Sequence, residues 1–283
     1  MTPRVGYLMH GCVALAAVAI LSGTVAAQDQ VVVGQGSFLE VIGTTAPDPL
    51  PQGGPTPRMD DGRPDLSGVW FSGRIGRPSA WSRTPRVRLV EDPVPFRPEV
   101  QEKLDSMTRT QIQLTSPGVN CLPKGVPGMF TTNPHPFMLL TTPGRFIQLT
   151  EVNNEWRLIH TDKRPHPEYP DPLFNGNSSA GWEDDTLVID TIAIDERTWV
   201  LNNGWYHSDE LRVTERIRRP SLNYLKYQFT AEDPKVLTAP WTSAWRTFSL
   251  SQDDEDLLEN YCTNNENPEQ FQQLFDQETS RNR

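Results

Sequence analysis

The sequence has little of several features that would point directly to a function. It contains only three cysteines in 283 residues, and its 26 lysines and arginines face 36 aspartates and glutamates. It has no basic stretch, which argues against nucleic acid and anionic lipid as partners. After the first 27 residues there is also no apolar run of the roughly 20 residues that a bilayer-spanning helix needs. We therefore expect no membrane span in the mature protein.

The signatures of several common enzyme classes are also missing. The sequence has no glycine-rich phosphate loop and no Gly-x-Ser-x-Gly nucleophile elbow. These absences argue against a bound nucleotide and against chemistry of the α/β-hydrolase type. We expect the protein to work without a cofactor.

The first 27 residues have the pattern of a signal peptide. Arg4 supplies a positive charge, residues 13–21 form a short apolar stretch, and residues 25–27 are small side chains ahead of a cleavage site at Gln28. An uncleaved signal anchor is the alternative. We predict an exported protein, periplasmic or secreted, whose net charge changes from −10 to −11 when the segment with Arg4 is removed.

Cleavage of the signal peptide would remove Cys12 and leave two cysteines, Cys121 and Cys262. Two cysteines in an oxidising compartment most simply form one disulfide. The bond would close a loop of roughly 140 residues and stabilise the fold by about 4–5 kcal/mol through lost chain entropy in the unfolded state. The alternative is a free nucleophilic cysteine, which would need a nearby base and a reducing environment.

The rest of the chain is typical of strands joined by irregular loops. It has 26 prolines and few patterns of helical period. Short apolar segments bounded by turn residues predict strands at 137–141, 145–151, 155–161, 186–192, 211–218, 222–230, 245–250 and 257–262. Strands at this spacing indicate a mostly β fold, with a single antiparallel barrel or a strongly curved sandwich.

We divide the mature chain into a Pro/Gly-rich segment at 28–64 and a β-rich domain at 65–283. Gly68 and Trp70 resemble the Gly-x-Trp motif in the first strand of lipocalins, where the tryptophan plugs the closed end of the barrel. This resemblance makes a lipocalin-like barrel our preferred form. A few helices accompany it, at 98–114 and at 267–275, and we expect the second to cover a barrel end or an exposed edge.

The most informative polar residues lie at or beside the ends of two predicted strands, and on the first strand His160 and Asp162 continue the apolar face of Trp156 and Leu158. His160 and Asp162 are two residues apart, as are His207 and Asp209, and side chains at this spacing share one face of a strand. The same period places Glu215 on an apolar face, where a carboxylate needs a partner or a raised pKa. We predict that His207, oriented by Asp209, acts as general acid or base and that Glu215 supplies a second carboxylate. In the alternative, Glu215 pairs with a buried arginine and the other two residues fix a turn.

Further residues are predicted to bind the substrate. Arg164 suits an anionic or carbonyl oxygen, and aromatic rings near His207 suggest an aromatic-walled cleft. The predicted substrate-binding residues are Asp162, Arg164, His166, Trp199, Trp205 and Trp241. The alternatives are a turn locked by Asp162 and Arg164 with an exposed His166, and tryptophans that pack in the core or at its rim. A weaker alternative is a metal site at His160, Asp162 and His207, although no His-x-x-x-His or cysteine pair fixes its geometry.

Four motifs occur in an order that we recognise. They are Trp-Glu-Asp-Asp-Thr-Leu-Val-Ile-Asp-Thr at 182–191, His-Ser-Asp-Glu-Leu-Arg-Val-Thr-Glu-Arg at 207–216, Glu-Asp-Pro at 232–234 and Pro-Trp-Thr at 240–242. Over roughly 65–267 the chain resembles a large family of uncharacterised exported bacterial β-rich proteins. That family usually has glycine at the position of Lys163 and often an aromatic residue at that of His160. The resemblance implies no activity, and it shifts our interpretation from His160 towards His207, Asp209, Asp162, Arg164 and His166.

These observations lead to two hypotheses. The first is an exported protein that acts on a small molecule, as a cofactor-independent lyase, isomerase or hydrolase with His/carboxylate acid–base chemistry. The second is a non-catalytic domain that binds a small ligand such as a sugar, lipid or peptide. The sequence does not predict the oligomeric state.

Overall fold

A computed structural model describes residues 44–45, 53–72, 87–88, 91–131, 135–251, 256–262 and 273. The predicted signal peptide lies outside the described residues, as does nearly all of the helix predicted at 267–275. None of the helices within the described ranges is long and apolar enough to cross a bilayer.

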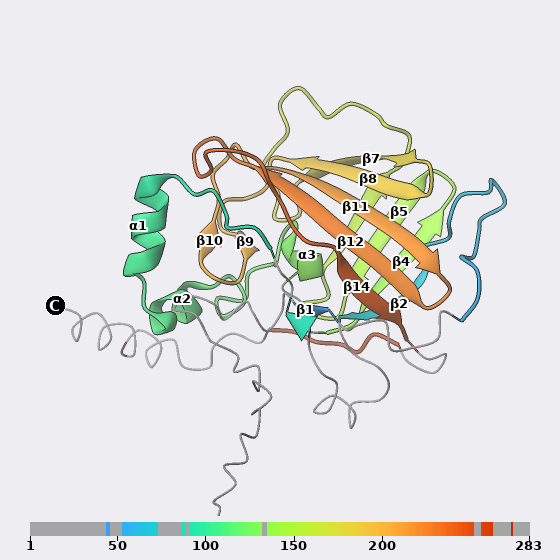
Figure 1. The fold of residues 1–283 in the computed structure, drawn as a ribbon, viewed down its shortest axis with the longest axis horizontal. Helices are drawn as coiled ribbons and strands as arrows, with labels where there is room; N and C mark the ends of the chain where they lie inside the picture. The colour runs from blue at the N-terminus through green and yellow to red at the C-terminus, as the bar shows by residue number, and fades with distance from the viewer. Residues whose placement is uncertain are drawn as a thin grey trace, which may run out of the picture. The chain divides into compact units, whose positions relative to one another are not determined.

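Nine strands close into a single β-barrel (Figure 1). Around the ring they are β11 (Arg212–Ser221), β8 (Thr186–Ile192), β7 (Asn177–Glu183), β6 (Trp156–His160), β5 (Arg145–Thr150), β4 (Phe137–Thr142), β2 (Gly68–Ser72), β14 (Arg246–Leu250) and β12 (Tyr224–Glu232). Pairing of β12 with β11 closes the ring. Neighbouring strands are antiparallel except β6 and β7, which are parallel. The predicted mostly β fold with one barrel is confirmed.

Three short pairings lie outside the ring. Strand β13 (Trp241–Thr242) adds to β12, β9 (Trp199–Leu201) pairs with β10 (Trp205–Tyr206), and β1 (Thr44–Thr45) pairs with β3 (Val87–Arg88). The strand predicted at 257–262 is instead an extended strap, joined to the β5–β6 turn by one bridge between Asn260 and Val152. Strand β7 was not predicted, because its Asn-Ser-Ser-Ala-Gly sequence has no alternation of apolar and polar residues.

The helix predicted at 98–114 is two helices, α1 (Pro98–Ser106) and α2 (Arg109–Thr115). The chain becomes extended at Met107, and Thr108 then caps α2. Thr108 Oγ1 accepts a hydrogen bond from the backbone N–H of Gln111, whose side-chain oxygen accepts one from the backbone N–H of Thr108. This reciprocal capping box explains why a new helix begins at this point.

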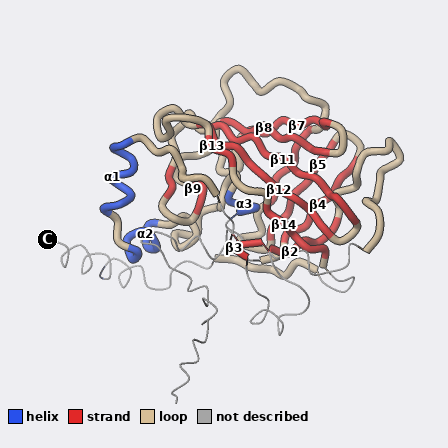
Figure 2. Tube along the Cα trace, viewed as in Figure 1, coloured by secondary structure: helices blue, strands red, loops and turns tan. Residues whose placement is uncertain are grey.

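The short helix α3 (Gly128–Thr131; Figure 2) is buried along its whole length. Its Phe130 ring stacks on Tyr227, with the ring centroids 4.2 Å apart, and meets Phe137 edge-on at 5.1 Å. Phe248 packs against Phe137 at 4.9 Å. Aromatic side chains from α3, β4, β12 and β14 therefore fill this part of the core.

The Gly-x-Trp motif lies where the β11–β12 turn meets the segment before β2. Trp70 is fully buried, and its indole N–H donates to the carbonyl oxygen of Leu66. The guanidinium carbon of Arg219 lies 4.9 Å from the Trp70 ring centroid, and this arginine donates to the carbonyl oxygens of Asp65, Ser67 and Leu222. Trp70 and Arg219 thus hold the segment before the first barrel strand against the turn.

Side chains alternate with period two in both β11 and β6, but only in β11 is the predicted face the buried one. Val213, Glu215 and Ile217 are all fully buried, which confirms the predicted inward position of the carboxylate. In β6, however, Trp156 is 65% exposed, whereas Arg157 is buried. The prediction that Trp156, Leu158 and His160 continue an apolar inner face is therefore wrong. The reason is that Glu215, inside the barrel, forms an ion pair with Arg157 and so keeps the arginine buried.

Candidate functional site

Glu215 lies in the barrel interior as half of a buried ion pair. Its two oxygens accept hydrogen bonds from the Arg157 guanidinium at 2.7 and 2.8 Å, and Tyr227 donates to it at 3.0 Å. The remaining Arg157 Nε–H donates to Gln148. Burial and the neighbouring carboxylate raise the pKa of Tyr227, which keeps its hydroxyl protonated. The contacts of Glu215 are those of the alternative interpretation, a carboxylate paired with a buried arginine.

His207 is buried beside the β9–β10 hairpin. Its Nδ1 lies 2.9 Å from the carbonyl oxygen of Ser208, which can only accept, so Nδ1 carries the proton. Burial lowers the pKa of His207 and favours the neutral ring. Its Nε2 lies 2.9 Å from the hydroxyl of Thr198, which also donates to the carbonyl oxygen of Asp195. Since Thr198 is fully buried, this hydroxyl–imidazole contact is closed to solvent.

We expect His207 to make the protein less stable as the pH falls below its ordinary pKa of 6.5. Burial depresses the folded-state pKa, so the unfolded chain takes up the proton first. The stabilisation is complete above pH 6.5 and is lost as the pH falls towards the folded-state pKa. Urea unfolding of His207→Asn should show a flatter pH dependence than the wild type between pH 6.5 and about 5. His135→Gln, which removes a half-buried imidazole that contacts Glu151 elsewhere in the fold, is the comparison. Equal slopes for wild type and His207→Asn would contradict the expectation.

Asp209 lies at the surface, apart from the two buried groups. Its carboxylate pairs with Lys235 at 2.5 Å, and this contact lowers the pKa of Asp209. Strand β10 ends at Tyr206 and β11 begins only at Arg212, so the period-two order does not extend through residues 207–211. The structure therefore does not bring His207, Asp209 and Glu215 together.

The loop after β6 places the other predicted polar residues. Asp162 and Arg164 form an exposed ion pair at 2.6 Å, which holds the pKa of Asp162 far below its usual range. These contacts are those of the alternative interpretation, a turn lock, but His166 is half-buried and not exposed as that alternative had it. Lys163 between Asp162 and Arg164 has a φ of 56°, a left-handed conformation that glycine adopts without strain.

His166 belongs to a polar cluster that was not predicted. Its Nε2 lies 2.9 Å from Asp190, and its Nδ1 lies 2.7 Å from the side-chain amide of Asn177. Asp190 also accepts two hydrogen bonds from Arg212, at 2.7 and 2.8 Å. Partial burial opposes ionisation of Asp190, but its hydrogen bonds to Arg212 and His166 prevail and lower its pKa. A carboxylate within the apolar run of β8 was the sequence signal for this cluster.

Arg212 connects the cluster to a surface groove with a volume of about 710 Å³. The groove runs between the segment after β8, the segment before β11 and the loop before β7. Its apolar lining includes Pro170, Pro172, Ile192, Ile194 and Leu211. Of the residues predicted to be catalytic, Asp209 reaches this groove.

Acidic side chains dominate the charge of the groove. Four carboxylates line it, from Asp195, Glu196, Asp209 and Glu210, against the guanidinium groups of Arg197 and Arg212. Arg197 pairs with Asp195 at 2.6 Å, while Arg212 pairs with Asp190. Among the described residues, Glu196 takes part in none of the ion pairs. The groove therefore combines an apolar surface with an excess of negative charge.

The predicted tryptophans do not line this groove. Trp205 and Trp241 are 1% and 4% exposed, and their ring centroids lie 5.3 Å apart in an edge-to-face contact. Trp199 is half-buried in β9. These positions are those of the packing alternative. His160, Asp162 and His207 likewise form no metal-ligand cluster, since the described ranges hold no group of three such side chains.

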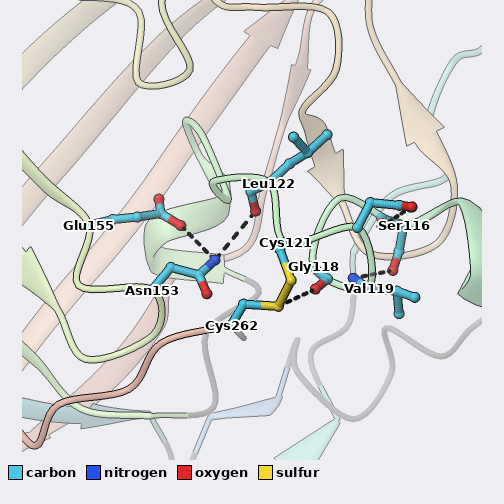
Figure 3. Close-up of a disulfide and its surroundings, with 9 residues drawn as sticks. Ser116, Gly118, Val119, Cys121, Leu122, Asn153, Glu155 and Cys262 are labelled. Carbon is cyan, nitrogen blue, oxygen red and sulfur yellow. Dashed lines mark hydrogen bonds between the residues drawn. A yellow bond between two sulfur atoms is a disulfide. The ribbon is translucent and has the colours of Figure 1, made fainter. Parts of the chain in front are cut away.

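The predicted disulfide between Cys121 and Cys262 is confirmed, with the two Cα atoms 5.4 Å apart (Figure 3). Beside it, Asn153 donates to the carbonyl oxygen of Leu122 and to Glu155, which ties the loop before α3 to the β5–β6 turn. Burial raises the pKa of Glu155. The disulfide fixes the strap to the loop before α3, and these hydrogen bonds hold that loop against the β5–β6 turn.

Comparisons with protein-family models, with curated proteins and with solved structures gave no match to this chain. The resemblance to exported bacterial β-rich proteins consequently stays a prediction from its motifs.

Proposed function

We propose that this exported protein is a binding domain for a small organic cation, such as an amine or the basic side chain of a peptide. The acidic groove beside β8 and β11 carries the proposal. Its apolar lining suits the hydrocarbon part of such a ligand, and its four carboxylates favour a positive group. Glu196 is the best anchor, because the other three carboxylates already pair with Arg197 or Lys235.

The contacts of the predicted catalytic residues favour binding over catalysis. Glu215 is held by Arg157 and Tyr227, and both nitrogens of His207 have hydrogen-bond partners inside the protein. A general acid or base must reach the proton that it transfers. A solvent-borne ligand would have to break buried contacts to reach either of these groups.

We expect Glu196→Gln to weaken binding of an organic cation about tenfold, the loss of roughly one charge-assisted hydrogen bond. Isothermal titration with an alkyl diamine, with an arginine-containing dipeptide and with an uncharged alcohol of equal length tests this expectation. The uncharged alcohol should bind weakly to both forms. Glu102→Gln removes the same charge from exposed α1 and serves as the matched control. Equal affinity for cation and alcohol, or an effect of Glu102→Gln as large as that of Glu196→Gln, would overturn the proposal.

A second candidate is an acid–base enzyme, in keeping with the first hypothesis from the sequence. It is favoured by one observation, the contact between half-buried His166 and Asp190 at the edge of the groove. Mass spectrometry of the ligand after incubation with the protein distinguishes the two candidate functions. An unchanged ligand supports the binding domain. A product that disappears with His166→Asn supports the enzyme.

A further inference from the structure

The outer surface of β4, β5 and β6 carries an apolar patch. The antiparallel register aligns its residues in two cross-strand rows, one of Met138, Leu149 and Trp156 and one of Leu140, Ile147 and Leu158. We call these six residues the outer apolar patch. Trp156 is 65% exposed, Leu158 45% and Leu140 37%.

The patch is unusual because β6 has its polarity inverted, with a tryptophan facing outwards and an arginine facing inwards. Single exposed apolar residues are common on soluble proteins, but contiguous patches usually mark a surface that another element covers. Two aligned rows on three neighbouring strands are such a patch. Its arrangement as two adjacent rows of cross-strand neighbours suits the apolar face of an amphipathic helix.

The described C-terminal strap is fixed beside this patch. The backbone N–H of Leu258 donates to Glu151 at 3.1 Å, and the Asn154 side chain donates to the carbonyl oxygen of Asn260 at 3.4 Å. Figure 3 shows Cys262 close to the turn that carries Asn153, three residues before Trp156. The chain therefore continues from a point near the first residue of β6.

The sequence after Cys262 has a segment that fits the patch in length and pattern. Residues 263–283 follow the strap, and Phe271, Leu274 and Phe275 have the i, i+3, i+4 spacing of one helix face. A helix over 267–275 would be about 13 Å long, and three neighbouring strands span roughly 10 Å from first to last. The five residues from Cys262 to Asn267 reach up to about 17 Å.

The negative charge of the C-terminal residues complements an arginine beside the patch. Residues 263–283 contain four acidic residues, Glu266, Glu269, Asp276 and Glu278, and two arginines, Arg281 and Arg283. The row next to the patch carries Arg145 opposite His160.

The N-terminal segment is placed less well to cover the patch, because the carbonyl oxygen of Gly54 accepts a hydrogen bond from Leu222 in the β11–β12 turn and β1 contacts β14.

We propose that residues 267–275 dock on the outer apolar patch as an amphipathic helix, with Phe271, Leu274 and Phe275 against Trp156 and Leu158. The docked helix would bury the most exposed aromatic ring of β6. The chain that follows the disulfide-bonded strap would then contact β4, β5 and β6.

Hydroxyl-radical footprinting of the mature protein tests the docking, with the rate at Trp156 compared with that at Tyr169, which is 85% exposed and lies outside the patch. We expect Trp156 to react several-fold more slowly than Tyr169 in the full chain. It should react several-fold faster in a form that ends at Cys262 and in Phe271→Ser/Phe275→Ser. The control Gln272→Ser/Gln273→Ser should keep the protection.

A Trp156 that is as reactive as Tyr169 in the full chain would overturn the proposal. Protection that persists in the form ending at Cys262 would also overturn it, and light scattering would then show whether a second copy covers the patch. The paired phenylalanine and glutamine variants keep the chain length constant, so the test does not depend on the folding of the shortened form.

Discussion

Arg157→Met is expected to lower the free energy of unfolding by about 3–5 kcal/mol, the cost of leaving one member of a buried ion pair without its partner. Glu215 is fully buried, and Arg157 donates to both of its oxygens. Without the guanidinium, the carboxylate must remain charged in the core or take up a proton. Urea unfolding at neutral pH measures the loss.

The double variant Arg157→Met/Glu215→Leu should recover most of this stability, because it removes both charges and fills the space with hydrocarbon. Arg216→Met is the matched control, since Arg216 pairs with Glu183 on the exposed side of β11. Such exposed pairs contribute less than about 1 kcal/mol. A loss for Arg157→Met as small as that for Arg216→Met would mean that the interior tolerates a lone carboxylate.

Cys121→Ser/Cys262→Ser is expected to lower the unfolding free energy by about 5 kcal/mol, since the disulfide closes a loop with a sequence separation of 141 residues. The stabilisation comes mainly from the smaller number of conformations open to the cross-linked unfolded chain. Guanidinium unfolding of the variant measures the change. Wild-type protein with its disulfide reduced provides an independent comparison and should lose a similar amount. No loss in either sample would show that the strap contributes little to the folded barrel.

The sequence was most informative where one strand alone determines the pattern. Val213, Glu215 and Ile217 alternate regularly with polar residues, and their shared inward position was predicted correctly. The strand boundaries at β8 and β5 were also close to the predicted ones, because clear turn residues flank them. Local alternation and turn chemistry are sufficient for such elements.

The predictions failed where partners come from distant parts of the chain. Arg157 is buried because Glu215, 58 residues later, lies opposite it inside the ring. No pattern within β6 contains that information, and its apolar residues alone suggest the wrong face. The candidate site is equally non-local. Backbone hydrogen bonds between Leu173 and the segment at Ala193 and Asp195 hold two distant segments of the groove together.

The uneven number of strands in the barrel has a topological consequence. A closed ring in which every neighbour runs the opposite way needs an even number of members, so a nine-membered ring must contain a like-directed pair. Here that pair is β6 and β7, and residues 161–176 must double back outside the wall to join them. This connection places His166 beside Asp190 and places Pro170 and Pro172 in the lining of the groove. The proposed binding site is thus a by-product of how an odd barrel closes.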